Sequence, residues 1–182
     1  MIPAGYMYKR IAPRPEWLNC GNVTKIYSVS GCISKDFTNY IPHWKHNKYW
    51  FFNNPEDMDT IIGEEKLSDE LELLFYEVYE KQFEAEEYVW QEFQGEETFG
   101  LQVKLPLQKD FLGFDMVSYS TGNSHECSPL SCNLLCQEVN VNQYCLLEDF
   151  NFTLHLTETL HIKKCEPGPY RIIAVHKVDK TT

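Results

Sequence analysis

The chain has 182 residues, a hydrophobic fraction of 43% and a formal net charge of −11. A chain of this length can bury a core without disulfide staples, and it lacks the apolar run of about 18 residues that a membrane-spanning helix needs. We therefore expect one globular domain over residues 1–182 that does not enter a membrane. The first residues do not resemble a secretory signal, so we expect a cytoplasmic protein.

Apolar periodicity and turn residues predict the elements of the first half of the chain. We expect a strand at 23–30, a short helix at 36–40, a strand at 48–52, and a helix from Pro55 to Ile62 that Asn54 caps. Residues 71–79 carry aromatic and β-branched residues beside leucines and glutamates, so they favour a strand but would tolerate a helix.

In the second half, the same signals predict strands at 88–93, 99–105, 114–119 and 170–178, and helices at 128–138 and 147–160. Strands that mostly follow one another, with a few helices inserted, are typical of α+β folds. The sequence therefore predicts an α+β domain with a mostly antiparallel sheet and three or four helices.

The negative charge is concentrated in the middle of the chain. Residues 56–97 hold sixteen carboxylates against two lysines, whereas residues 1–55 hold seven basic residues against two acids. Carboxylates this dense repel one another, so they form either a solvated face or a surface that docks on a basic partner. The second interpretation assigns partner binding to Glu64, Glu65, Glu84, Glu86, Glu87, Glu96 and Glu97, with Trp90, Tyr88 and Phe93 as aromatic anchors.

The first third of the chain interleaves cations with aromatic residues, a composition suited to stacking on bases and holding phosphates. An alternative hypothesis is therefore a DNA-binding protein that uses Lys9, Arg10, Trp44, Lys45, His46 and Lys48. The competing interpretation is that the aromatic residues belong to the core and the lysines to an ordinary surface.

The seven cysteines are an odd number, which favours free thiols in a reducing compartment. Cys127, Cys132, Cys136 and Cys145 lack the paired spacing of zinc sites, so we expect core thiols and neither a metal nor a cofactor. His125 and Cys127 lie in the polar loop 120–128, where an enzyme of unrecognised type would have its site. No catalytic motif is present, so a non-enzymatic protein is the prediction.

Four segments together resemble a family of small uncharacterised bacterial proteins: IYSVSGCI at 26–33, HWKHNKYWFF at 43–52, ECSPLSCN at 126–133 and EPGPYRI at 166–172. The size, acidity and lack of enzyme motifs also resemble anti-CRISPR proteins that inhibit single-effector RNA-guided DNA nucleases. This resemblance implies an acidic inhibitor that occupies the cationic surfaces of a nuclease and has no catalytic residues. An immunity or antitoxin protein that caps a basic nuclease is a further alternative.

Overall fold

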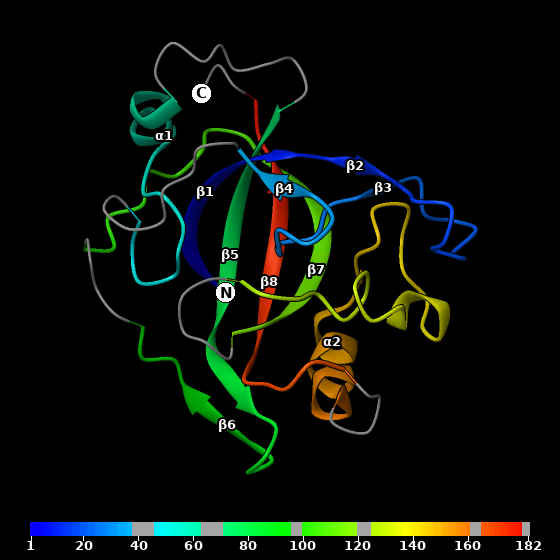
Figure 1. Cartoon of the computed structure of the whole chain (residues 1–182). Coiled ribbons are helices and arrows are strands. Elements are labelled where there is room, and N and C mark those ends of the chain that lie inside the picture. Colours follow the sequence, from blue (N-terminus) through cyan, green and yellow to red (C-terminus); the bar gives the residue numbers. More distant parts are fainter. Residues whose placement is uncertain (38–45, 63–70, 96–99, 120–124, 161–164, 180–182) are drawn as a thin grey trace.

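A computed structural model describes residues 1–37, 46–62, 71–95, 100–119, 125–160 and 165–179 (Figure 1). A curled antiparallel sheet forms its centre, with the strand order β4-β1-β5-β8-β7 and with β6 paired to the far end of β5. These strands are β1 (Ile2–Arg10), β4 (Lys35–Asp36), β5 (Leu71–Glu84), β6 (Val89–Glu92), β7 (Asp110–Ser118) and β8 (Tyr170–Lys177). The other elements are the small pair β2 (Ala12–Pro13) and β3 (Lys25–Ile26), the helices α1 (Pro55–Ile62) and α2 (Phe150–Glu158), and the 3-10 helix η1 (Leu135–Gln137).

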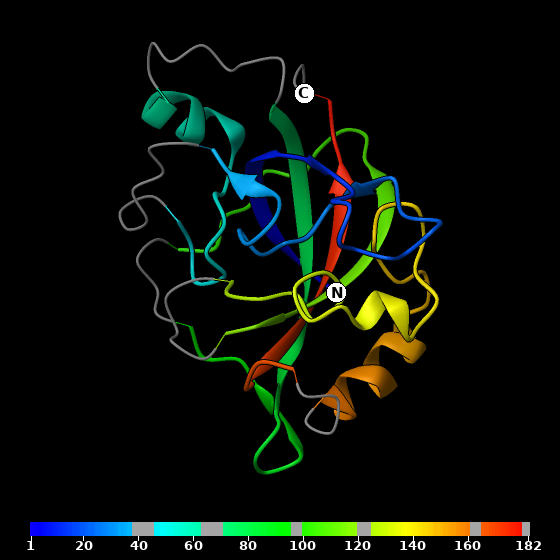
Figure 2. The ribbon, with the colours of Figure 1, turned by 45° about the vertical axis from the view of Figure 1, so that its right-hand side comes forward.

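The curl of the sheet is visible in two views of the ribbon (Figures 1 and 2). The ladder shifts register next to Gly5 in β1 and next to Gly113 in β7, and such bulges increase the local bend of a strand. Both glycines have φ values that favour glycine, +128° and +144°. A Cβ on Gly5 would lie 2.3 Å from the carbonyl oxygen of Phe52, so the missing side chain also lets the segment around Phe52 pair with β1.

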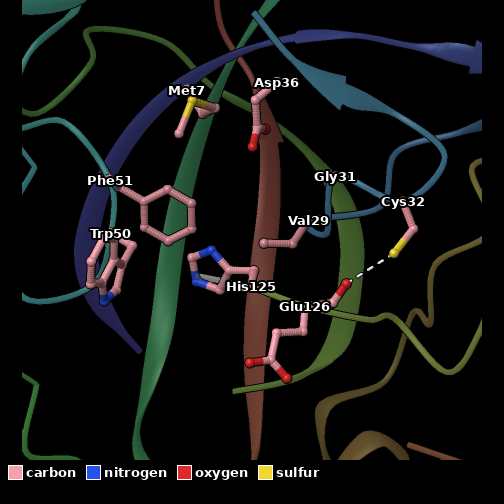
Figure 3. Close-up of a pocket in the computed structure, with 9 residues that line it drawn as sticks. All are labelled: Met7, Val29, Gly31, Cys32, Asp36, Trp50, Phe51, His125 and Glu126. Atoms are coloured by element: carbon pink, nitrogen blue, oxygen red, sulfur yellow. Dashed lines mark hydrogen bonds between the residues drawn. The ribbon is translucent and has the colours of Figure 1, made fainter. Parts of the chain in front are cut away.

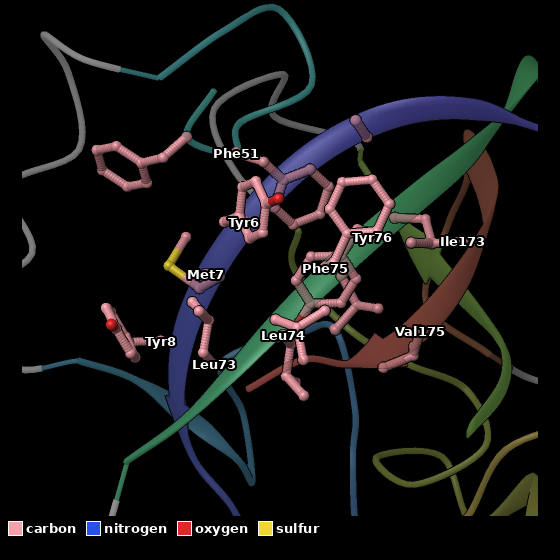
Figure 4. Close-up of a cluster of buried hydrophobic side chains, with 14 of the residues drawn as sticks. Tyr6, Met7, Tyr8, Phe51, Leu73, Leu74, Phe75, Tyr76, Ile173 and Val175 are labelled. Carbon is pink, nitrogen blue, oxygen red and sulfur yellow. The ribbon is translucent and has the colours of Figure 1, made fainter. Parts of the chain in front are cut away.

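Both faces of the sheet are covered by apolar side chains, which alternate along the central strands. On β8, Ile173 belongs to the core cluster that contains Phe51 and Tyr76, whose rings stack with their centroids 4.4 Å apart (Figure 4). The neighbouring Ile172 belongs to the second cluster, which includes Leu156 of α2. The sheet is therefore the middle layer between the segment around Phe51 and helix α2.

The expectation of three or four helices is wrong. The described residues contain two α-helices, and 13% of these residues are helical. Residues 128–138 form turns and η1 instead of a helix, because Leu134 adopts a left-handed conformation with φ 63° that an α-helix cannot contain. The short helix expected at 36–40 does not begin at Asp36, because Lys35 and Asp36 form β4 and pair with β1. Residues 38–40 lie outside the described residues.

Where local signals were strong, the predicted elements are confirmed. Helix α1 begins after Asn54, whose Oδ1 accepts a hydrogen bond of 2.9 Å from the Asp57 amide. Residues 71–79 form a strand, which continues to Glu84, and β6, β7 and β8 overlap the strands expected there. Helix α2 begins later than expected, after the N-cap Asp149.

Three other strand predictions are wrong, and one strand was not predicted. Of residues 23–30 only Lys25 and Ile26 pair as a strand, and residues 48–52 form turns in which Phe52 bridges to Tyr6. Residues 100–105 form no strand. The sequence signals missed β1, which pairs with β5 along its whole length.

Candidate functional site

The β5–β6 hairpin extends beyond the rest of the sheet (Figures 1 and 2). Glu84 pairs with Val89 and Phe83 with Trp90, which leaves residues 85–88 as the turn. The Phe83 side chain is buried and its ring centroid lies 5.2 Å from that of Trp90, so packing fixes the hairpin close to its turn. Its tip is therefore a firmly held projection.

Tyr88 is the exposed aromatic residue at this tip. Its side chain is 58% exposed, and the neighbouring Val89 is 40% exposed. The Tyr88 backbone has φ 55°, in the left-handed region that costs a residue with a Cβ roughly 1–2 kcal/mol. The Tyr88 ring packs edge-on against that of Phe83, with the centroids 5.4 Å apart, and the rest of the side chain faces solvent. A strained backbone that presents an exposed aromatic side chain is a feature of binding sites.

A hollow of about 580 Å³ beside the hairpin tip has four carboxylates in its lining. Its lining includes Glu84, Glu86, Glu87 and Glu166, and the Glu86 and Glu87 side chains are exposed. In the described part of the chain, none of these four forms an ion pair with lysine or arginine. Two have amide partners, since Gln91 donates to Glu87 at 3.0 Å and Gln82 donates to Glu84. The hollow is therefore strongly negative.

Other carboxylates of the acidic segment are neutralised internally. Glu72 lies 2.8 Å from Lys177 Nζ and 3.6 Å from Lys25 Nζ, while Glu77 lies 2.7 Å from Lys109 Nζ. Burial opposes ionisation of both carboxyls, but these cations and hydrogen bonds prevail and lower the pKa of each. The unpaired acidic surface is thus narrower than the charge distribution suggested, and Glu64, Glu65, Glu96 and Glu97 lie outside the described residues.

The other two expected anchors, Trp90 and Phe93, are held by the protein itself. The Trp90 indole Nε1 donates a hydrogen bond of 2.9 Å to Glu158 Oε1 on α2, and the side chain is half-buried. Phe93 lies against the buried Arg171, whose guanidinium carbon is 3.7 Å from the ring centroid. This contact places Phe93 in a cation–π cage inside the molecule. Of the three aromatic residues, Tyr88 is the exposed one.

The residues of the alternative nucleic-acid surface are divided between core and surface. Lys9 is fully buried, donates to the carbonyls of Val29 and Ser30, and lies 3.1 Å from Asp36. His46 is also buried and stacks on Trp50. Arg10 is exposed, Lys48 is half-buried, and Trp44 and Lys45 lie outside the described residues.

A separate pocket near the start of β5 is basic. Its lining includes the exposed Arg10, Lys25 and Lys35, together with Glu72, and its volume is about 580 Å³. The sequence placed Arg10, Lys25 and Lys35 in the basic first third of the chain, and the pairing of β1 with β4 brings Lys35 opposite Arg10.

A third pocket, of about 280 Å³, is lined by His125, Glu126, Cys32, Asp36 and aromatic side chains (Figure 3). The His125 ring stacks on Phe51 at 4.6 Å. Burial, together with the charges of Arg171 and Lys9, holds the pKa of His125 well below its usual value, so this imidazole is neutral at pH 7. Among the described residues no hydrogen bond joins it to Cys127, so the catalytic pair considered for this loop is not assembled.

One cysteine, Cys32, lines this third pocket. The exposed Cys32 thiol donates to the Glu126 carbonyl at 3.0 Å, drawn as a dashed line in Figure 3. The Cys132 sulfur lies 3.8 Å from the Ser30 hydroxyl and 3.9 Å from the Ser131 hydroxyl. The sequence carried no signal for Cys32. In the described part of the chain, no group of three or more His, Cys, Asp or Glu side chains is arranged to hold a metal ion.

Comparison of the chain with protein families, with curated proteins and with solved structures finds no match. No helix in the described ranges is long and apolar enough to cross a bilayer.

Proposed function

We propose that this protein is a non-enzymatic binding protein that docks the tip of its β5–β6 hairpin on a basic partner. The observation that carries this proposal is the coincidence of the exposed Tyr88 with a hollow lined by four carboxylates that no lysine or arginine neutralises among the described residues. An exposed aromatic residue supplies apolar contact area, and the carboxylates supply electrostatic attraction and orientation.

The partner class that fits this surface best is a nucleic-acid-binding protein with an exposed cationic channel. Following the resemblance to anti-CRISPR proteins, we propose an RNA-guided DNA nuclease, which reads its recognition motif through arginines and holds its heteroduplex in a positively charged channel. Glu86 and Glu87 would compete with DNA phosphates for these cations. The protein would then act as an inhibitor.

The test is a DNA-cleavage assay with a single-effector RNA-guided nuclease, at increasing concentrations of this protein. Reversing both Glu86 and Glu87 to lysine should weaken inhibition by about 100-fold, because like charges across an interface cost several kcal/mol. The matched control changes Glu16 and Asp110 to lysine, two exposed carboxylates away from the hairpin, and alters the net charge equally. Inhibition should also weaken as salt is raised.

Two results would count against the proposal. Equal inhibition by the hairpin variant and the control would remove the hairpin from the interface. A wild-type protein that leaves cleavage unchanged would refute the nuclease as the partner.

A second candidate function is direct contact with DNA, which the basic pocket favours. Arg10, Lys25 and Lys35 lie together there, and cations in a pocket of this kind bind phosphates. Changing Arg10 and Lys35 to glutamate should abolish any shift of non-specific duplex in a gel, whereas the Glu86 and Glu87 reversal should leave the shift in place. No shift with the wild type at low salt would exclude this function.

A further inference from the structure

One charged side chain is wholly enclosed by the fold. Arg171 lies near the start of β8, on the same face of the sheet as Ile173 two residues later, and its side chain is fully buried. Three aromatic rings surround its guanidinium carbon, which lies 3.7 Å from the ring centroid of Phe93, 4.8 Å from that of Tyr49 and 5.8 Å from that of Tyr119. The fold therefore keeps a positive charge in its interior.

The aromatic rings do not satisfy the hydrogen-bonding capacity of this guanidinium. Cation–π contacts involve the faces of the rings, whereas the N–H donors of an arginine lie in the guanidinium plane and need acceptors with lone pairs. In the part of the chain that the structure describes, neither Nε nor either Nη of Arg171 has a hydrogen-bond partner. Burial lowers the pKa of Arg171 to about 10, so the group is still charged at pH 7. A buried charge without a partner is unfavourable and requires an explanation.

Two carboxylates of the sheet, Asp115 and Asp36, are engaged with other groups. Asp115 lies in the strand that pairs with β8, and its oxygens accept hydrogen bonds from two backbone amides and from the Ser128 hydroxyl. Asp36 lies 3.1 Å from the buried Lys9 Nζ. Among the described residues, no carboxylate forms an ion pair with Arg171. The partner that would neutralise Arg171 is therefore an anion from solution.

His125 adds a second donor next to the rings around this charge. Its ring centroid lies 5.8 Å from that of Tyr119, which is one of the three rings that surround Arg171. The His125 Nε2 atom is buried and has no hydrogen-bond partner within the described ranges. Burial and the charge of Arg171 lower the pKa of His125, so the imidazole is neutral and can donate through Nε2–H.

The pocket of about 280 Å³ provides a way toward this position. His125 forms part of its lining (Figure 3), and through its contact with Tyr119 it connects the pocket to the rings around Arg171. The carboxylates of Asp36 and Glu126 also belong to the lining, and they repel an anion more strongly the higher its charge. A small anion with a single negative charge therefore fits this entrance best.

We propose that Arg171, assisted by His125, binds a small monovalent anion inside the curled sheet. The planar guanidinium can donate two parallel N–H bonds to a carboxylate such as formate, and its charge also attracts chloride and nitrate. The bound anion neutralises a charge that the folded protein otherwise keeps unpaired, so the anion stabilises the folded state. This site is separate from the acidic hollow and from the basic pocket, and it does not depend on the proposed inhibitor function.

The first experiment follows the arginine Nε–H signals of the wild-type protein by proton–nitrogen NMR. The chain has three arginines, and the signals of the exposed Arg10 and Arg14 are assigned from R10K and R14K. Sodium gluconate, which supplies a bulky anion, is replaced stepwise by chloride, nitrate, formate or acetate at constant ionic strength. The Arg171 signal should shift along a saturating curve, whereas the signals of Arg10 and Arg14 should change little.

The choice of anion defines the ligand more closely. A response to formate and acetate alone would identify a carboxylate, and an equal response to chloride and nitrate would identify small monovalent anions in general. An Arg171 signal that responds to none of the four anions would overturn the proposal. A larger response to divalent sulfate than to any of them would contradict the choice of a monovalent ligand.

The second experiment measures the melting temperature in the same salts. Replacing gluconate by about 100 mM of the small anion should raise the melting temperature of the wild type by roughly 5 °C, because the anion binds only the folded state. R171M removes the charge and its donors, so its melting temperature should be the same in every salt. R14M, which removes an exposed arginine, is the matched control and should respond as the wild type does. Equal responses of R171M and the wild type would refute the site. The NMR experiment needs no change at Arg171, so it decides even if R171M does not fold.

Discussion

Replacing Asp115 with asparagine tests how burial controls the pH dependence of this fold. Asp115 is fully buried in β7, and its carboxylate accepts hydrogen bonds from the Val29 amide at 2.8 Å, the Met116 amide at 2.9 Å and the Ser128 hydroxyl at 2.6 Å. These bonds favour the charged form, but burial outweighs them and raises the pKa from 3.8 to about 6. Between about pH 4 and pH 6, the folded protein therefore keeps a proton on Asp115 that the unfolded chain releases.

The magnitude follows from the difference between the two pKa values, 6 − 3.8 = 2.2. At about 1.4 kcal/mol per pH unit, it corresponds to roughly 3 kcal/mol. Because the pKa of the folded state is the higher one, the stabilisation is fully present below pH 4 and is lost as the pH rises through 6. Asp115 thus contributes a stability that falls toward neutral pH, opposite in sign to the contributions of Glu72 and Glu77.

The assay is urea unfolding of the wild type and Asp115→Asn between pH 4 and pH 7.5. Asparagine cannot ionise, so the free energy of unfolding of the wild type minus that of the variant should fall by about 2 to 3 kcal/mol over this range. Asp110→Asn, an exposed carboxylate on the same strand, should leave the corresponding difference nearly flat. A difference for Asp115→Asn that stays constant, or that grows with pH, would refute the reasoning.

Three further changes test local features of the fold. Asp149→Ala removes the side chain that caps α2 and should lower the free energy of unfolding by about 1 kcal/mol. The melting temperature should then fall by roughly 2–4 °C, which calorimetry would measure. Gly113→Ala places a Cβ 2.6 Å from Leu146 Cβ at φ +144°, so it should lower the melting temperature by more than Asp149→Ala does. A melting temperature equal to that of the wild type would contradict the role of the bulge. Trp90→Phe keeps the ring packing but loses the bond to Glu158, and should cost about 1 kcal/mol in urea unfolding, with Trp17→Phe, an exposed indole, as the neutral control.

The sequence predicted elements whose signals are local. Asn54 and Pro55 define the start of α1 because a cap and a first-turn proline act within one helical turn. β1 carried no such signal, since Pro3 and Gly5 are typical of loops. Its strand conformation comes from pairing with β5, nearly seventy residues away in sequence, and from the bulge that Gly5 permits. The helix expected at 128–138 does not form for a similar reason. The Ser128 hydroxyl donates a hydrogen bond to Asp115, and Leu134 adopts a left-handed conformation.

The candidate site was predictable only in part. The density of carboxylates pointed to Glu84, Glu86 and Glu87, but not to which acids the protein would neutralise. That depends on Lys109 and Lys177, which reach Glu77 and Glu72 through the pairing of β5, β7 and β8.

The length of β5 separates the two charged regions of the molecule. The basic pocket lies by Glu72 near its first residue, and the acidic hollow lies by Glu84 at its last, roughly 40 Å apart along a fully extended strand. The two pockets therefore lie at opposite ends of β5. A partner docked on the acidic hollow would then leave the basic pocket uncovered at the other end of the strand.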